Sequence, residues 1–245
     1  MSDSHGGPAM RGLLTDPSWE PAVRDGLESM ITAHAGGVAA FDFDDTLLDG
    51  DLSLALLADM EAEDPQGQRA HYEAACARDT RSGYAELVET LIVGRTEGEL
   101  RARTLRVLDR GLASGSLRFR PALVELIWAL QRNRWEVWVV TASPAVVINA
   151  AAQRIGIGAD RVLGMWCRAE HGRYVAPTQE PITYRRGKLD ALATVGRDHP
   201  TFAAGDAPTD LEMLGAAQYG LVVDRGDPLL AQAAHQRGWW VQSGL

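Results

Sequence analysis

The sequence has few of the features that mark secreted, membrane-spanning or metal-cluster proteins. Only two cysteines, Cys76 and Cys167, occur among 245 residues, and they are too far apart to form a paired metal-ligand motif. We therefore expect two buried or inert thiols and neither a zinc site nor a disulfide framework. No apolar run approaches the length of a membrane span, and residues 1–11 are polar and glycine-rich without an apolar signal core. These absences predict a cytoplasmic protein with no membrane partner.

Positive charge is also scarce. Lysine and arginine together number 24 against 33 aspartates and glutamates, which gives a formal net charge of −9 at pH 7. Such a balance argues against nucleic acid as the main partner, because nucleic acid is itself a polyanion. It does not exclude a small anionic substrate, since a site can be locally positive. The hydrophobic content of 46% is that of a folded globular protein, and the length suits one large domain with a modest insertion.

Residues 38–48 combine an apolar run with a cluster of acidic residues. The apolar run at residues 38–41 is typical of a strand that is buried on both faces of a parallel sheet. Asp42, Asp44 and Asp45 follow it, with Thr46 next. Carboxylates this close repel one another unless a cation or shared protons offset their charge, and carboxylate oxygens suit Mg²⁺. A strand that ends in a solvated acidic turn remains the alternative, because aspartate also favours turns.

Strand patterns alternate with helical patterns along most of the chain. The candidate strands are residues 38–41, 135–140, 161–166, 201–204 and 219–223. This alternation predicts an α/β fold with a doubly wound parallel sheet covered by helices on both faces. Residues 49–117 carry helical patterns and no convincing strand. We therefore predict a core domain from residues 1–48 and 118–245, a separate helical domain from residues 49–117, and a small hairpin excursion within residues 167–184.

Polar residues follow three of these strands. Asp42 and Asp44 come after the first strand, Thr141 after the second, and Asp206 and Asp210 after the fourth. In parallel sheets, ligands bind beyond the carboxyl ends of the strands, so these side chains should converge on one rim. Each residue also has an ordinary structural explanation, as a turn former or a helix cap.

Together with Lys188 at a helix start, these residues form the set that phosphoryl transfer requires: a nucleophile, an acid/base, a metal site and donors for phosphoryl oxygens. The sequence resembles the phosphatases of the haloacid dehalogenase superfamily, in the branch similar to phosphoserine phosphatase. Asp42-Phe43-Asp44-Asp45-Thr46 matches the DxDxT motif, and Thr141, Lys188 and Gly205-Asp206 with Asp210 match the second, third and fourth motifs. The resemblance covers about residues 38–210.

The resemblance implies a role for each matching residue. Asp42 would attack phosphorus and become an aspartyl-phosphate. Asp44 would protonate the leaving alcohol and later deprotonate the water that cleaves the intermediate. Thr46 would steady the turn that presents both carboxylates, while Thr141 and Lys188 would bind phosphoryl oxygens.

The resemblance also implies a bound Mg²⁺. Asp42, the backbone carbonyl of Asp44 and Asp206 would hold this ion, and Asp210 would position a metal-bound water. The insertion at residues 49–117 would be a helical cap that covers the site, excludes water and contacts the leaving group.

Departures from the family pattern bear on the substrate. Asp51 stands where phosphoserine phosphatases carry the acidic residue that meets the substrate amino group. The segment at residues 88–94 lacks the arginine that meets the serine carboxylate, and it presents Glu89 instead. The sequence around Thr141 and Lys188 is also similar to phosphocholine phosphatases. A quaternary ammonium would require aromatic side chains, and the candidates are Tyr84, Trp166, Tyr174 and Tyr184.

We thus predict a Mg²⁺-dependent phosphomonoesterase that hydrolyses a small phosphorylated metabolite, with phospho-amino alcohols such as phosphocholine or phosphoserine as candidates. A phosphotransferase of the same superfamily and a non-catalytic binding protein are the alternatives. The sequence leaves open the natural substrate, the oligomeric state, the role of Asp45 and the role of the pair Trp239-Trp240.

Overall fold

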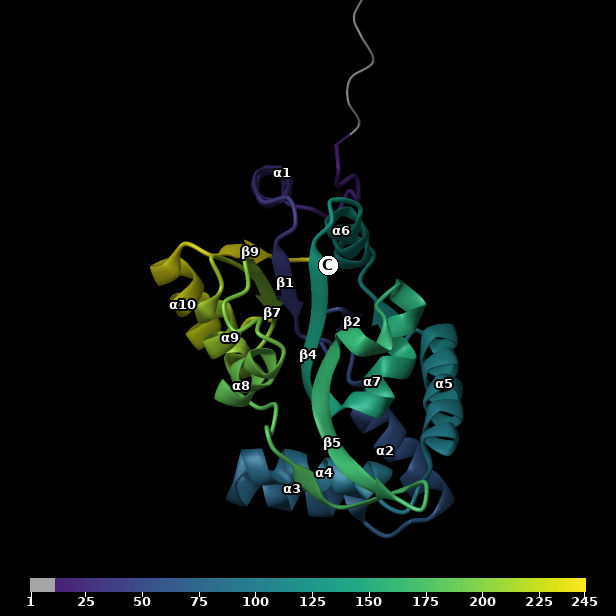
Figure 1. The fold of residues 1–245 in the computed structure, drawn as a ribbon. Coiled ribbons are helices and arrows are strands. Elements are labelled where there is room, and N and C mark those ends of the chain that lie inside the picture. The colour runs from purple at the N-terminus through teal and green to yellow at the C-terminus, as the bar shows by residue number, and fades with distance from the viewer. Residues whose placement is uncertain (1–11) are drawn as a thin grey trace, which may run out of the picture.

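The computed structural model describes residues 12–245, so the polar, glycine-rich stretch at residues 1–11 lies outside the described residues. Within this part of the chain, a seven-stranded sheet has the order β6-β5-β4-β1-β7-β8-β9, and β2 pairs with β3 separately (Figure 1). Neighbouring strands of the large sheet are parallel except β5 and β6. The strands are β1 (Val38–Phe41), β2 (Leu48–Asp49), β3 (Arg118–Phe119), β4 (Glu136–Pro144), β5 (Val162–Glu170), β6 (Arg173–Gln179), β7 (Phe202–Gly205), β8 (Tyr219–Val223) and β9 (Trp240–Gln242).

Helices connect the strands and cover both faces of the sheet, which confirms the predicted doubly wound α/β fold (Figure 1). The α-helices are α1 (Pro21–Ala33), α2 (Leu52–Glu63), α3 (Gln68–Arg78), α4 (Thr80–Ile92), α5 (Glu97–Ser114), α6 (Pro121–Arg132), α7 (Ala145–Ala152), α8 (Arg186–Thr194), α9 (Leu211–Ala216) and α10 (Pro228–Arg237). Short 3₁₀ turns lie at Gln153–Ile155, Ala159–Arg161 and Pro208–Asp210. None of the helices in residues 12–245 combines the length and the apolar character that a membrane crossing requires.

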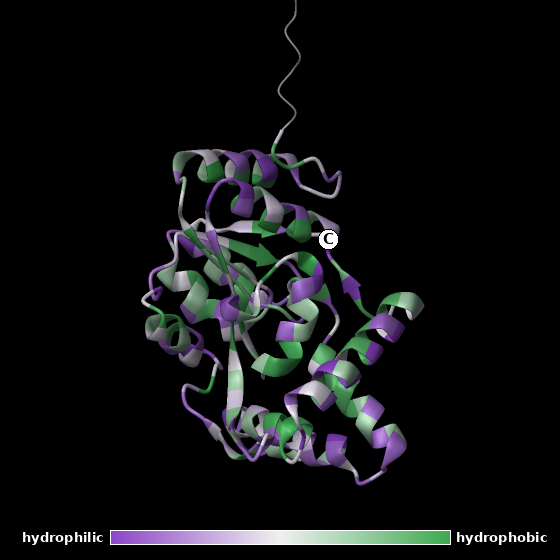
Figure 2. Cartoon of the chain, turned by 45° about the vertical axis from the view of Figure 1, so that its right-hand side comes forward, coloured by the Kyte–Doolittle hydropathy of each residue, from purple (hydrophilic) through white to green (hydrophobic). Residues whose placement is uncertain are grey.

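The alternation of side chains along the strands divides the core into two layers. Ala40 of β1 packs with Trp138 of β4 and with the apolar sides of α8, α9 and α10. Ala39 and Phe41 face the opposite layer, where α1, α6 and α7 pack. Figure 2 shows hydrophobic and hydrophilic residues alternating along the helices, as expected where each helix buries one side. Because β1 is covered on both faces, its residues are apolar throughout, and its polar neighbours begin only where the strand ends.

The helices α2 to α5 form an insertion between β2 and β3, which we call the helical insertion. Leu48 pairs with Phe119 and Asp49 with Arg118 in antiparallel register, so the two connections to the core lie side by side. The turn between Val93 and α5 is closed by a capping box, in which Thr96 accepts from the amide of Glu99 and the Glu99 carboxylate accepts from the amide of Thr96.

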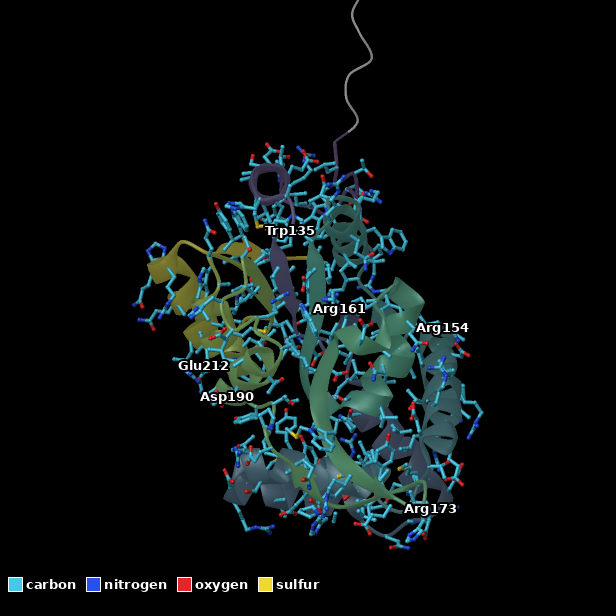
Figure 3. The ribbon with its side chains drawn as sticks, in the orientation of Figure 1. Trp135, Arg154, Arg161, Arg173, Asp190 and Glu212 are labelled. Carbon is cyan, nitrogen blue, oxygen red and sulfur yellow. The ribbon has the colours of Figure 1, made fainter. Side chains whose placement is uncertain are left out.

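The hairpin β5–β6 extends the sheet beyond the core and reaches the helical insertion. The amide of Gly94 donates to the carbonyl of Tyr174, and the amide of Tyr174 donates to the carbonyl of Arg95. Figure 3 shows Arg173 at the end of the hairpin, where its guanidinium donates to the Gly94 carbonyl at 2.7 Å and to Glu99 at 3.2 Å. The insertion is therefore attached to the core at β2–β3 and again at this hairpin.

Several predicted boundaries are displaced. The strand predicted at residues 135–140 continues to Pro144, because its last residues reach β5 through a shift in register. The strand predicted at residues 161–166 extends to Glu170, where it pairs with Arg173. Cys167 is a buried free thiol and Cys76 is a half-buried one.

Candidate active site

The carboxyl ends of β1, β4 and β7 meet the first turn of α8 at one small cavity. Its volume is about 90 Å³, small beside the roughly 300–1,000 Å³ of sites for drug-sized ligands. Its lining residues are Asp42, Asp44, Asp45, Asp51, Tyr84, Thr141, Ala142, Ser143, Lys188, Asp206, Ala207 and Thr209. The residues expected to meet at this rim do lie together, with Asp210 packed directly beneath.

Lys188 is the only lysine in the sequence, and its side chain is the centre of the site. It is 1% exposed, and its Nζ lies 2.5 Å from Asp42 Oδ1 and 2.5 Å from Asp210 Oδ1. Burial alone would lower the pKa of Lys188, but the charges of Asp210 and Asp42 outweigh burial and raise it above its ordinary value. The ammonium group therefore stays charged and offsets two buried carboxylates.

Asp42, Asp206 and Asp210 form a compact carboxylate cluster. One oxygen from each lies within 4.8 Å of the others, and all three side chains are buried. The Thr46 hydroxyl lies 3.1 Å from Asp42 Oδ2 and 2.8 Å from Asp206 Oδ1, so it ties the first motif to the fourth. Burial, with the neighbouring carboxylates, raises the pKa of Asp42 to about 8 despite Lys188, and the pKa of Asp206 to about 6. Buried oxygen donors whose charges repel one another fit a hard divalent cation such as Mg²⁺.

The backbone after β7 is shaped around Asp210. The amides of Asp206 and Ala207 each donate to Asp210 Oδ2 at 3.2 Å. A Cβ atom at Gly205 would lie 2.6 Å from the Asp210 side chain. Only glycine therefore fits at residue 205, which explains why it precedes the aspartate pair.

Asp44, which lines the same cavity, is held by two hydrogen-bond donors. Ser143 Oγ donates to Asp44 Oδ2 at 2.6 Å, and the amide of Leu52 donates to Asp44 Oδ1 at 2.8 Å. Burial and then the charge of Asp51 raise the pKa of Asp44 well above its ordinary range. A carboxyl group with a raised pKa keeps its proton to higher pH, which suits the role of a general acid. Ser143 was not predicted, although its place two residues after Thr141 was visible in the sequence.

Thr141 lies at the end of β4 with its side chain buried against the same cavity. Its Oγ1 accepts from the amide of Ser143 at 3.1 Å, and its carbonyl accepts from the hydroxyl of Thr183 at 2.5 Å. Thr183 therefore ties the segment before α8 to β4. The Thr141 hydroxyl keeps its proton free to donate to a ligand oxygen.

Asp45, unexplained by the sequence, closes the turn of the first motif. It adopts φ 61°, in the left-handed region that aspartate tolerates better than most residues. Its amide donates to the Gly50 carbonyl, and its Oδ1 accepts from the Gly50 amide, both at 3.1 Å. The same Oδ1 contacts Nη1 of Arg225, in the loop after β8. Arg225 was not predicted as a neighbour of this site, and no motif in the sequence pointed to it.

Asp51 and two tyrosines form the outer part of the site. Asp51 caps α2 by accepting from the amide of Leu54 at 2.8 Å, and burial raises its pKa to about 6. Tyr84 of α4 lines the cavity, and its ring centroid lies 5.4 Å from that of Tyr184. Burial and then the charge of Asp51 raise the pKa of Tyr84 to about 12.

The other residues considered for substrate selection lie elsewhere. Trp166 and Tyr174 line a separate cavity of about 190 Å³ between β5, α7 and the helical insertion. Glu89 accepts from the amide of Thr178 at 2.8 Å, so its carboxylate holds the β5–β6 hairpin against α4. Glu89 is not among the residues that line the cavity around Lys188, and its role in substrate selection stays a prediction.

Comparisons with known proteins bear on the family. The haloacid dehalogenase-like hydrolase family matches residues 39–215. No curated protein sequence matches the chain. A solved protein of unknown function from Anaerococcus prevotii DSM 20548 is 15% identical with a TM-score of 0.75, over 95% of this chain and 94% of that chain.

Two further solved structures share the fold. A phosphoserine phosphohydrolase-like protein from Francisella tularensis subsp. tularensis SCHU S4 is 15% identical with a TM-score of 0.59, over 84% of this chain and 94% of that chain. A phosphoserine phosphatase in its apo form is 16% identical with a TM-score of 0.55, over 81% of this chain and 90% of that chain. At such identities the structural similarity establishes the fold alone. The match to the family is what shows that the chain belongs to it. The chain, matched from β1 into α9, belongs to the haloacid dehalogenase-like hydrolase family.

Proposed function

We propose that the protein is a Mg²⁺-dependent phosphomonoesterase that hydrolyses a small phosphorylated metabolite through an aspartyl-phosphate on Asp42. One observation carries this proposal: Lys188 Nζ lies 2.5 Å from both Asp42 and Asp210, beside a cavity that Asp44 also lines. This arrangement supplies a nucleophile, a fixed positive charge and a protonated carboxyl group around one small space.

The proposed reaction has two steps. An Asp42 carboxylate oxygen attacks phosphorus, the ester P–O bond breaks, and the leaving oxygen takes the proton of Asp44. Asp44, now a carboxylate, accepts a proton from water while the water oxygen attacks phosphorus and the bond to Asp42 breaks. Both carboxyl groups then return to their starting states, and inorganic phosphate is released.

The chain's own residues would stabilise the charge that develops in both steps. Lys188 and the hydroxyl of Thr141 bind phosphoryl oxygens, and Ser143 fixes the orientation of Asp44. A Mg²⁺ held by Asp42, Asp206 and the backbone carbonyl of Asp44, with Asp210 beside it, would neutralise phosphoryl charge. A cation there would also lower the raised pKa of Asp42 and so favour the ionised nucleophile.

The outer part of the cavity favours a substrate with a cationic amine. Asp51 offers a carboxylate and Tyr84 offers an aromatic ring, which together suit an ammonium group, and the Tyr184 ring packs against that of Tyr84. Lys188 is the only basic side chain among the described residues that line the cavity. A substrate carboxylate would therefore have no cationic partner, so we infer phosphocholine or phosphoethanolamine ahead of phosphoserine.

We further propose that residues 49–117 act as a cap domain over residues 1–48 and 118–245. Tyr84 and Asp51 come from this insertion, so its position determines the room beside the phosphate site. The cavity of about 90 Å³ suits a closed state, in which water is excluded around the reacting groups.

Variants of the two catalytic aspartates test the proposal with p-nitrophenyl phosphate. Asp42→Asn should abolish the release of both p-nitrophenol and phosphate. Asp44→Asn should abolish phosphate release, yet still give a burst of p-nitrophenol, because this good leaving group needs no proton. Asp109→Asn, a surface change on α5, serves as the matched control, and EDTA should stop the unaltered protein. Retained turnover in Asp42→Asn would refute the assignment of the nucleophile.

A further inference from the structure

Arg225 brings a positive charge to the edge of the carboxylate cluster. It lies in the loop between β8 and α10, in contact with Asp45, and its Nη1 is 3.6 Å from Asp206 Oδ2. The other oxygen of Asp206 is the one that accepts from Thr46. Arg225 therefore lies beside the free oxygen of a residue that would bind the cation.

Asp45 is fixed firmly enough to hold Arg225 in this place. Its carboxylate accepts from the amide of Gly50, its own amide donates to the Gly50 carbonyl, and its carbonyl accepts from Arg120 Nη2 at 3.3 Å. The Arg120 side chain is itself buried. The position of Arg225 is thus determined by a turn that belongs to the catalytic motif.

The two residues act in opposite directions on a cation at the cluster. The guanidinium repels a divalent ion and attracts the Asp206 carboxylate, so Arg225 weakens cation binding. The Asp45 carboxylate attracts the ion and neutralises Arg225, so it strengthens cation binding. As a pair they leave the cluster with little added charge of either sign.

We propose that Asp45 and Arg225 are a pair of positioning residues that sets the affinity of the Asp42, Asp206 and Asp210 cluster for its divalent cation. This inference rests on the metal requirement of the proposed function. It assigns a role to Asp45 that the DxDxT pattern leaves undefined, and it brings the loop after β8 into the metal site.

The test is a cycle of single and double substitutions, with Mg²⁺ binding measured by calorimetry in the absence of substrate. Arg225→Met should bind Mg²⁺ about tenfold more tightly, the size expected for a unit charge acting on a divalent ion through a largely aqueous path. Asp45→Asn should bind it about tenfold more weakly, since asparagine keeps the left-handed turn while the freed guanidinium can move onto Asp206. The double variant should return close to the unaltered protein, and so should Arg225→Lys.

A purely structural role gives a different pattern. If the pair only stabilises the turn, both single substitutions should weaken Mg²⁺ binding and lower the melting temperature. That result would overturn the proposal. Unchanged affinity in both variants would overturn it too. Arg24→Met, which removes an exposed arginine paired with Asp25 on α1, is the matched control.

The same cycle separates this inference from the proposed function. Suppose that the two single substitutions shift the Mg²⁺ affinity in opposite directions, but the protein hydrolyses no phosphate ester. This result would support the inference and refute the phosphatase assignment. A protein with no Mg²⁺ binding in any variant would overturn both the inference and the proposed metal requirement.

Discussion

Replacing Lys188 by methionine is the perturbation whose consequences the structure specifies most fully. Methionine has an unbranched side chain one atom shorter than that of lysine, so the substitution keeps most of the stem and removes the positive charge between Asp42 and Asp210. Breaking a buried ion pair by removing one partner costs about 3–5 kcal/mol, because the remaining charge is left unpaired in the interior. Against a total free energy of unfolding of about 5–15 kcal/mol, this loss is large but leaves room for a folded variant.

The loss of stability in Lys188→Met should depend on pH, and the pKa values of the buried carboxyl groups determine the direction of this dependence. Burial raises the pKa of Asp206 to about 6 and that of Asp42 to about 8, and Lys188 acts to lower both, so the substitution should raise both further. A raised carboxyl pKa makes the native state bind more protons than the unfolded state, so stability falls as pH rises. In the unaltered protein, Lys188 has a raised pKa, so its contribution is fully present throughout the neutral range. The difference between the two proteins should therefore be larger at pH 8 than at pH 5.

Urea denaturation followed by circular dichroism, with EDTA present, measures this difference at both pH values. Arg186→Met is the matched control, because Arg186 lies at the same helix start but is exposed and pairs with Asp190. We expect this control to stay within about 0.5 kcal/mol of the unaltered protein. A Lys188→Met protein as stable as the original at pH 8, or equally destabilised at pH 5 and pH 8, would refute this electrostatic reasoning.

Two further predictions concern the groups around the nucleophile. Ser143→Ala removes a hydrogen bond that lowers the pKa of Asp44, so that pKa should rise further and the alkaline limb of the kcat/KM profile should move to higher pH; an unmoved limb would contradict the acid role of Asp44. Asp51→Asn should raise the KM for phosphocholine about tenfold and leave that for p-nitrophenyl phosphate unchanged, because asparagine also caps α2. Asp79→Asn at the cap of α4 is its control, and equal effects on both substrates would exclude ammonium recognition by Asp51.

The positions of the motif residues could be predicted because parallel strands bring their carboxyl ends to one rim. Asp42 and Asp206 each follow a strand whose apolar run is plain in the sequence. Thr141 lies in the last part of β4, and Lys188 lies in the first turn of α8 next to them. The fold follows from the same alternation of strands and helices. Periodicity and spacing were sufficient to predict the fold and the meeting of the strand ends, because both follow directly from the order of strands in a parallel sheet.

Contacts between loops have no such periodic signal. The pairing of Asp45 with Arg225 joins two turns whose sequences give no sign of each other. The carboxylate of Glu89, whose role in substrate selection stays a prediction, accepts hydrogen bonds from the β5–β6 hairpin, and nothing in the sequence indicated this contact. A sequence can show that an acidic residue lies near a site, but the direction of its side chain depends on neighbours that packing alone provides.

Detection of a phosphorylated Asp42 tests the central claim most directly. After rapid acid quenching of a reaction with p-nitrophenyl phosphate and Mg²⁺, mass spectrometry of the peptide that contains Asp42 should show one added phosphoryl group. The adduct should accumulate in Asp44→Asn, where no base activates water, and should be absent in Asp42→Asn. Steady phosphate release without any adduct, or an adduct on another residue, would contradict the account.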